Sequence, residues 1–333
     1  MLQVSHRLRA HVLFAAVMAA MPAAIAIAQQ GPVGVMYEFE QKRDASRGAS
    51  FQTVDAPAGQ AQSPLRIYLG AGDLERAFDT EQFRPDAAIV PTNTDLQITA
   101  AQPTTQRTLI TRVEKQPDVL RDLQAQVAER QKRPANAAGE PGVLRIGIDT
   151  FVAELPRSAA AASAGNFPKS VCLIATDYAK GGAVDRRELY AQDRLRQGVA
   201  ACLTALDAAG ARSVVLPLMG AASSEQQTND AMFEGQRALM ECRLINSTAG
   251  IALGIHDFQA NRRNLREIGV VQWDRELDAM FKVPANSRSA GAAQTAYRTY
   301  AEQVSSAFKR GLEGEKTTSS DVMGSCGPIL NIK

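Results

Sequence analysis

The chain has 333 residues, of which 45% are apolar and 22% are charged, so it can bury the core of one large domain or two small ones. Its 37 basic and 35 acidic residues leave a net charge of +2, which does not support bulk nucleic-acid binding, because that function needs a concentrated basic face. Aromatic residues make up only 5% of the chain, which argues against a base-stacking platform for single strands.

Residues 1–28 have the layout of a secretory signal peptide. Arg7 and Arg9 precede an apolar run at 12–26, and Ala26-Ile27-Ala28 forms a cleavage site. The run is short for a membrane span, although an uncleaved anchor is the alternative. We therefore expect a mature chain that starts near Gln29, is periplasmic or secreted, and meets a membrane only through this segment before cleavage.

Strand-like and helical patterns alternate after a linker at 29–49. Strands are expected at 51–54, 65–72, 86–91, 143–152, 165–176, 213–219 and 250–258. Helices are expected at 117–130, 185–209, 229–243 and within 263–283, where the domain closes; a further helix at 292–312 belongs to a C-terminal helical extension, residues 285–333. This alternation is typical of an α/β domain with a mostly parallel, covered sheet.

Two of the expected strands run into polar turns, the place where α/β sheets bind ligands. The strand at 65–72 leads directly to Asp73, and the strand that starts at Asp86 ends in Pro91-Thr-Asn-Thr-Asp95. The polar ends of these two strands therefore predict a ligand site.

The same residues resemble the macro domain family, which binds ADP-ribose. Gly72-Asp73-Leu74 followed by Ile89-Val-Pro-Thr-Asn93 is similar to that family's Gly-Asp-Ile and Ile-Val-Asn-Ala-Ala-Asn, and the Pro-Thr-Asn form resembles the macro-histone branch. Residues 165–169, 213–220 and 251–257 resemble later family segments in the same order. The resemblance covers residues 50–284 and implies a three-layer macro-like domain around a central mixed, mostly parallel sheet.

The resemblance also implies a role for each candidate ligand-binding residue. A carboxylate beside the adenine accepts its exocyclic amine, small residues and hydroxyls wrap the diphosphate at a helix start, and an imidazole stacks on the adenine. These roles fall, in order, on Asp73 with Leu74 next to it; on Gly220, Ala221, Ala222, Ser223 and Ser224; and on His256, while Thr92 and Asn93 would lie near the distal ribose.

Each of these residues has a structural alternative. Asp73 and Asn93 are also common turn residues, and residues 220–224 also suit a plain strand–helix turn. His256, next to Asp257, also suits a hydrogen-bonded structural histidine.

The departures from the family pattern favour binding over turnover. Pro91 and Thr94 stand where hydrolytic macro domains have two Asn residues, and no glycine-rich loop follows. We therefore predict a domain that binds ADP-ribose or a related nucleotide-diphosphate ligand. The alternatives are an ADP-ribosyl hydrolase of the same fold, with no catalytic residue identified, and a degenerate-pocket scaffold for envelope protein partners.

No cofactor or metal is expected. The four cysteines lack metal-ligand spacing; Cys172 and Cys202 are predicted as buried thiols and Cys242 with Cys326 as a disulfide. Glu75 stands where a Rossmann fingerprint needs its third glycine, and neither a Walker loop nor a Gly-x-Ser-x-Gly elbow occurs.

Overall fold

The computed structural model describes residues 50–55, 65–72, 85–98, 116–132, 142–155, 168–177, 192–219, 233–273 and 290–317. The predicted signal peptide and linker, at residues 1–49, lie outside these ranges.

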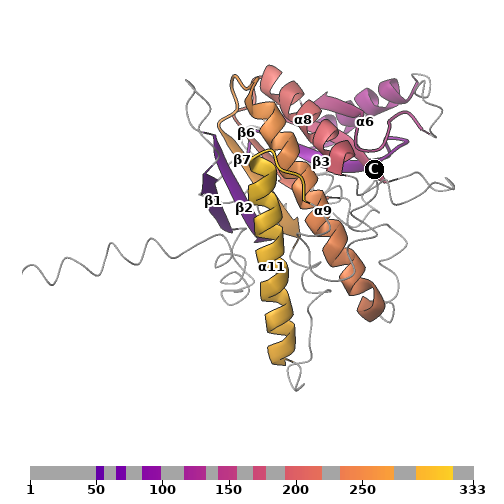
Figure 1. Cartoon of the computed structure of the whole chain (residues 1–333). Helices are drawn as coiled ribbons and strands as arrows, with labels where there is room; N and C mark the ends of the chain where they lie inside the picture. Colours follow the sequence, from indigo (N-terminus) through magenta and orange to yellow (C-terminus); the bar gives the residue numbers. More distant parts are fainter. Residues whose placement is uncertain are drawn as a thin grey trace, which may run out of the picture.

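A seven-stranded sheet lies at the centre of the described structure, in the order β1-β2-β7-β6-β3-β5-β4 (Figure 1). β2, β7, β6, β3 and β5 run parallel, and β1 and β4 pair antiparallel at the two ends. The expected mixed, mostly parallel sheet is thus confirmed. Its strands are β1 (Ser50–Asp55), β2 (Arg66–Gly72), β3 (Ala87–Asn93), β4 (Thr150–Glu154), β5 (Ser170–Asp177), β6 (Ser213–Pro217) and β7 (Glu267–Trp273).

Helices cover both faces of the sheet (Figure 1). One hydrophobic cluster joins strand residues such as Ile67 and Ile89 to α8 (Gln192–Ala208), α9 (Phe233–Gln259) and α11 (Ala290–Leu312). A second cluster joins the alternate strand residues, such as Tyr68 and Val90, to α6 (Pro117–Gln131). Because neighbouring strand residues point to opposite faces, the central strands are apolar on both sides, as buried parallel strands are. The expected three-layer α/β architecture is confirmed.

The predicted strand at 250–258 is wrong: these residues form the second half of α9. Residues 244–255 are all buried, because α9 packs against both α8 and α11. A helix buried on nearly all sides has no polar face, so its sequence carries no helical period. The last strand is instead β7, inside the run that was predicted as a closing helix.

Two glycines explain how α9 approaches α8 so closely. A Cβ at Gly250 would lie 2.9 Å from the Gln192 carbonyl oxygen, and one at Gly254 would lie 2.8 Å from that of Arg196. Glycine costs a helix about 1 kcal/mol relative to alanine, and the close packing of the two helices offsets that cost.

The predicted strand at 143–152 is only partly right. Residues 142–149 form an irregular segment, and β4 begins at Thr150. Gly147 explains the difference, because its φ of +63° is incompatible with an extended strand.

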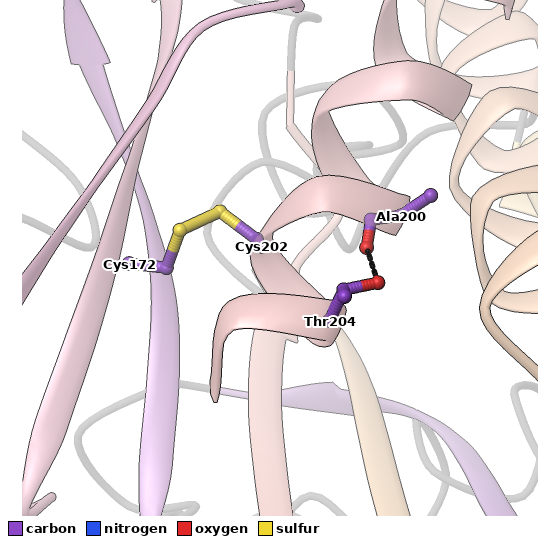
Figure 2. Close-up of a disulfide and its surroundings, with 4 residues drawn as sticks. All are labelled: Cys172, Ala200, Cys202 and Thr204. Atoms are coloured by element: carbon purple, nitrogen blue, oxygen red, sulfur yellow. Dashed lines mark hydrogen bonds between the residues drawn. A yellow bond between two sulfur atoms is a disulfide. The ribbon is translucent and has the colours of Figure 1, made fainter. Parts of the chain in front are cut away.

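Cys172 and Cys202 form a disulfide between β5 and α8, which corrects the prediction of two buried thiols (Figure 2). Both residues are fully buried in the core under α8. Cys242 is also disulfide-bonded, and its predicted partner, Cys326, lies outside the described residues.

Candidate functional site

The connections out of β3 and β6, which are adjacent, leave toward opposite faces of the sheet. The chain after β3 continues to α6 on one face, and the chain after β6 continues to α9 on the other. Such a divergence between neighbouring parallel strands opens a crevice at their carboxyl ends, the usual ligand position in α/β sheets. The candidate site is therefore the carboxyl edge of the sheet around β3 and β6.

The backbone pairing of β3 with β6 supports this placement. The ladder contains only two pairs, Ala87 with Val214 and Ala88 with Val215. By contrast, β3 stays paired with β5 as far as Asn93, and β6 stays paired with β7 as far as Pro217. Each strand remains paired with its outer neighbour, while the hydrogen-bonded pairing of β3 with β6 is confined to their amino-terminal halves.

Two prolines account for the short hydrogen-bonded ladder between β3 and β6. The Leu218 N–H donates to the Val271 carbonyl on β7 at 2.8 Å, so the preceding residue, Pro217, faces β3, because successive residues of a strand face opposite edges. The Leu155 N–H donates to the Lys169 carbonyl at 2.7 Å, which places Ile174 of β5 toward β3.

Pro91 is the register partner of Ile174 in the parallel pairing of β3 with β5. In such a pairing the backbone of Ile174 bonds to the residues before and after Pro91, so the backbone groups of Pro91 itself point toward β6. Neither proline has a backbone N–H to donate, and the ladder ends where both would have to. Each proline was visible in the sequence, but their apposition depends on the strand order.

Thr92 and Asn93 are the last two residues of β3, at the carboxyl edge of the sheet, and their side chains are buried at 3% and 5% exposure. The Asn93 Oδ1 accepts the backbone N–H of Gln97 at 2.9 Å, and its Nδ2 donates to Gln97 Oε1 at 3.1 Å. The Thr92 hydroxyl donates to the Gln97 carbonyl at 3.0 Å. Asn93 therefore has the turn role that was its structural alternative, and its hydrogen bonds fix the orientation of its amide.

The segment at 142–149 supports the turn after β3. The Thr94 carbonyl accepts the N–H groups of Val143 and Leu144, at 2.9 and 3.0 Å. Gly142 has a φ of +98°, and a Cβ there would lie 2.6 Å from the Thr94 oxygen. Only glycine permits this approach, so the segment holds the end of β3 through backbone contacts.

An ion pair closes this supporting segment. Arg145 donates from Nη2 and Nε to the two carboxylate oxygens of Asp149, at 2.8 and 3.0 Å, and its backbone N–H donates to the same carboxylate at 3.0 Å. These hydrogen bonds from Arg145 hold the pKa of Asp149 below its ordinary value, against the opposing effect of burial.

Asp149→Asn is expected to lower the free energy of unfolding by about 1 kcal/mol near neutral pH, because the pair is partly exposed to solvent. Since the folded-state pKa is depressed, the contribution is complete above the unfolded-state pKa and is lost as the pH falls through the folded-state value. Urea unfolding at neutral and acidic pH measures it. The difference between parent and variant should shrink in acid, and a constant difference would contradict the assignment.

His256 does not lie at a strand end, so the adenine-stacking position expected from a strand at 250–258 is not where the chain places it. It is part of α9, and its Nδ1 lies 2.9 Å from the Leu312 carbonyl at the end of α11. Its ring also contacts Gly314, where an added Cβ would lie 2.9 Å from Nε2. His256 thus has the structural alternative role, joining two helices.

The remaining predicted ligand residues lie outside the described residues: Asp73, Leu74, Gly220, Ala221, Ala222, Ser223 and Ser224. Among the residues that the structure does describe, there is no cluster of three His, Cys, Asp or Glu side chains suited to a metal ion. Within the same ranges, every helix is too short or too polar to span a membrane.

No protein-family model matches this chain, and a search of curated proteins finds no significant relative. Among solved structures, the chain is similar to a point variant of the Oceanobacillus iheyensis macrodomain, with 9% identity and a TM-score of 0.39 over 80% of this chain and 95% of that one. The same macrodomain with ADP gives 10% identity and a TM-score of 0.39, over 75% and 97%.

A variant of tomato leucine aminopeptidase gives 12% identity and a TM-score of 0.31, over 75% of this chain and 38% of that one. Likeness at these scores does not establish a common fold or family. The α/β class of this chain rests on its own sheet order and layers.

Proposed function

We propose that this protein is an exported macro-like domain that binds ADP-ribose or a related nucleotide-diphosphate ligand across the carboxyl edge of its sheet. The observation that carries the proposal is the divergence of the connections after β3 and β6 toward opposite faces of the sheet, next to a ladder that stops at Pro91 and Pro217. Three of the sequence segments that resemble macro domains, 72–74, 89–93 and 213–220, contain the carboxyl ends of β2, β3 and β6 at this edge.

The strand register supports a single extended site. Gly72, the residue before Asp73, pairs with Trp273 of β7, and Pro217 pairs with Val271 of the same strand. The chain therefore leaves β2 and β6 at the same edge with one strand between them, a separation of roughly 10 Å. An elongated ligand with adenine near Asp73, diphosphate near 220–224 and ribose near Asn93 follows the strand order β2, β7, β6, β3.

The hydrogen bonds of Asn93 select the ligand chemistry at the β3 end. Its Oδ1 accepts the Gln97 N–H and one Nδ2 hydrogen is donated to Gln97 Oε1, so the second Nδ2 hydrogen is the donor that the amide can offer a ligand. A ribose hydroxyl or a phosphate oxygen is a suitable acceptor. A fixed donor in a turn favours binding, and no described residue at this edge supplies a reason to prefer hydrolysis.

Export is the second part of the proposal. It rests on the signal-like residues 1–28 and is supported by the disulfide between Cys172 and Cys202, because disulfides persist in oxidising compartments. Expression of the full chain in bacteria, followed by fractionation, should recover a shortened protein in the periplasm or the medium.

Calorimetry with ADP-ribose tests the ligand. We expect binding by the parent protein and at least about tenfold weaker binding by Asp73→Ala, which removes the acceptor for the adenine amine. Asp118→Ala is the matched control, because this carboxylate is exposed on α6 and pairs only with Arg121. Absence of heat with ADP-ribose and ADP would refute the proposal, and undiminished binding by Asp73→Ala would refute only the adenine contact.

A further variant in the same experiment tests the crevice itself. Pro217→Val restores a backbone donor on the edge of β6 that faces β3, which allows the ladder to extend and narrows the opening. Weaker binding without a loss of stability is the expected result.

A further inference from the structure

A second concave surface lies along the outer edge of β4, at the amino edge of the parallel strands and away from the proposed nucleotide site. This groove has a volume of about 840 Å³. α6 contributes Asp122 and Gln126 to its lining, β4 contributes Val152 and Glu154, and the start of β5 and the end of α8 contribute Lys169 and Ala209. Of the strands that the structure describes, β4 is the last in the sheet on this side.

One side-chain amide in the groove bonds to β4 in the way that the backbone of a neighbouring strand would. The side-chain amide of Gln126 donates from Nε2 to the Glu154 carbonyl at 2.7 Å and accepts the Glu154 N–H at its Oε1 at 3.1 Å. Donating to one residue and accepting from the same residue is how a peptide group of an adjacent antiparallel strand binds. The outward groups of Glu154 are thus satisfied by a single amide from α6.

The next outward-facing residue of β4 lies in the groove. The Leu155 N–H bonds to Lys169 of β5 at 2.7 Å, so Glu154 and Val152, at alternate positions, direct their backbone groups away from the sheet. Val152 also lines the groove with a partly buried side chain. Its N–H and carbonyl are placed to accept a further strand.

The charge of the groove favours a basic peptide as the added strand. Neither Asp122 nor Glu154 forms an ion pair with another described residue, whereas Lys169 is neutralised by Asp86 at 2.8 Å. The last turn of α8, next to Ala209, has no basic residue to compensate the partial negative charge of a helix C-terminus. Among the described residues, the two acidic side chains at this edge and the C-terminus of α8 therefore lack a compensating positive charge.

We propose that this groove binds an extended, basic peptide segment of another protein, which adds to the sheet as a strand beside β4. The peptide exchanges backbone hydrogen bonds with Val152, and its Lys or Arg side chains lie against Asp122, Glu154 and the end of α8. Gln126 holds the edge in the free protein and limits its pairing with other sheets.

Fluorescence anisotropy with the purified full chain tests the proposal. The probe is a labelled peptide with the sequence acetyl-Lys-Val-Lys-Val-Lys-amide, and its counterpart has Glu in place of each Lys. We expect saturable binding of the Lys peptide and none of the Glu peptide. Failure of the Lys peptide to bind, or equal binding of both, would overturn the proposal whether or not the protein binds ADP-ribose.

Variants locate the binding. Asp122→Asn combined with Glu154→Gln should weaken the Lys peptide about fivefold, since each exposed charge pair contributes a small energy. Asp118→Asn combined with Glu129→Gln removes the same net charge from other positions of α6 and should leave the affinity unchanged. Equal effects of the two pairs would show general attraction to an acidic surface and refute the site.

Val152→Pro tests the added strand directly, because it removes an outward N–H while the ladder between β4 and β5 keeps its bonds. Peptide binding should fall at least tenfold, with an unchanged circular dichroism spectrum; retained affinity would refute strand addition. If this variant does not fold, Gln126→Ala provides the test of strand addition. It frees the backbone N–H and carbonyl of Glu154 for the peptide, which should tighten peptide binding about threefold. Unchanged or weaker binding by Gln126→Ala would then count against the proposal.

Discussion

Replacement of Asp207 with alanine is expected to lower the free energy of unfolding by about 3 kcal/mol or more. Asp207 ends α8 and is only 3% exposed. Its Oδ1 accepts the backbone N–H groups of Asn264 and Leu265, at 2.7 and 2.6 Å, and its Oδ2 accepts that of Arg263 at 2.9 Å. Removal of the carboxylate leaves these three donors without their acceptor.

The position of Asp207 in the fold makes the loss larger than that of an ordinary cap. The turn that it binds leads directly into β7, a central strand flanked by β2 and β6. The chain just after this turn is also bonded to the residue before β6, because the Arg212 carbonyl accepts the N–H groups of Arg266 and Glu267. Asp207 therefore fixes the entry to the strand that lies between the two proposed ligand-binding strand ends.

Urea unfolding of Asp207→Ala, Asp207→Asn and Asp193→Ala measures this contribution. Asn keeps one acceptor oxygen but turns a donor toward a backbone N–H, so its effect should lie between those of the parent and the alanine variant. Asp193 lies on the same helix in an exposed pair with Lys316, at 2.8 Å, and its loss should cost less than about 1 kcal/mol. Similar losses for Asp207→Ala and Asp193→Ala would contradict the assigned role of Asp207.

The sequence predicted those elements in which the hydrophobic period agrees with the residues that begin or end a helix or strand. In α6, Val119, Leu123 and Val127 recur on one face after Pro117, and the helix ends near its predicted boundary. β3 was predicted because a short apolar run meets a Pro-Thr-Asn turn. α6 ends within one residue of its predicted boundary, whereas β3 continues through Pro91 and ends two residues later, at Asn93.

The sequence failed where an element is buried from all sides. The apolar run at 250–258 has no polar face in either a helix or a strand, so its pattern does not distinguish the two. What decides is the packing of α9 between α8 and α11, which uses Gly250 and Gly254 as contact points. The error then shifted the last strand, so that β7 was predicted as a helix.

The candidate site was predictable only one strand at a time. Asn93 and Thr92 were identified from the polar end of β3, and they are the last two residues of that strand in the structure. That β6 is the neighbour of β3 follows from the crossover connections through α8 and α9, which bring residues more than a hundred positions apart together. The facing prolines at 91 and 217, where the ladder between β3 and β6 ends, could not be recognised before that adjacency was known.

The disulfide between Cys172 and Cys202 leads to the second large prediction. It closes a loop with a sequence separation of 30, and chain-entropy arguments give such a link about 3–4 kcal/mol, acting mainly on the unfolded chain. The double variant Cys172→Ala with Cys202→Ala should lose about this much free energy of unfolding. Urea unfolding without reductant measures it, and leaves the disulfide of Cys242 in place.

Burial separates this disulfide from an exposed, readily reduced one. Both cysteines have 0% exposure, and the bond spans directly from β5 to α8 (Figure 2). Thiol–disulfide exchange requires direct attack on a sulfur atom, so reductant should open this link only when the core opens. The rate of its reduction should therefore rise with urea in parallel with the rate of global unfolding. Rapid reduction in the absence of urea, or a double variant as stable as the parent, would show that the link between β5 and α8 does not stabilise the folded core.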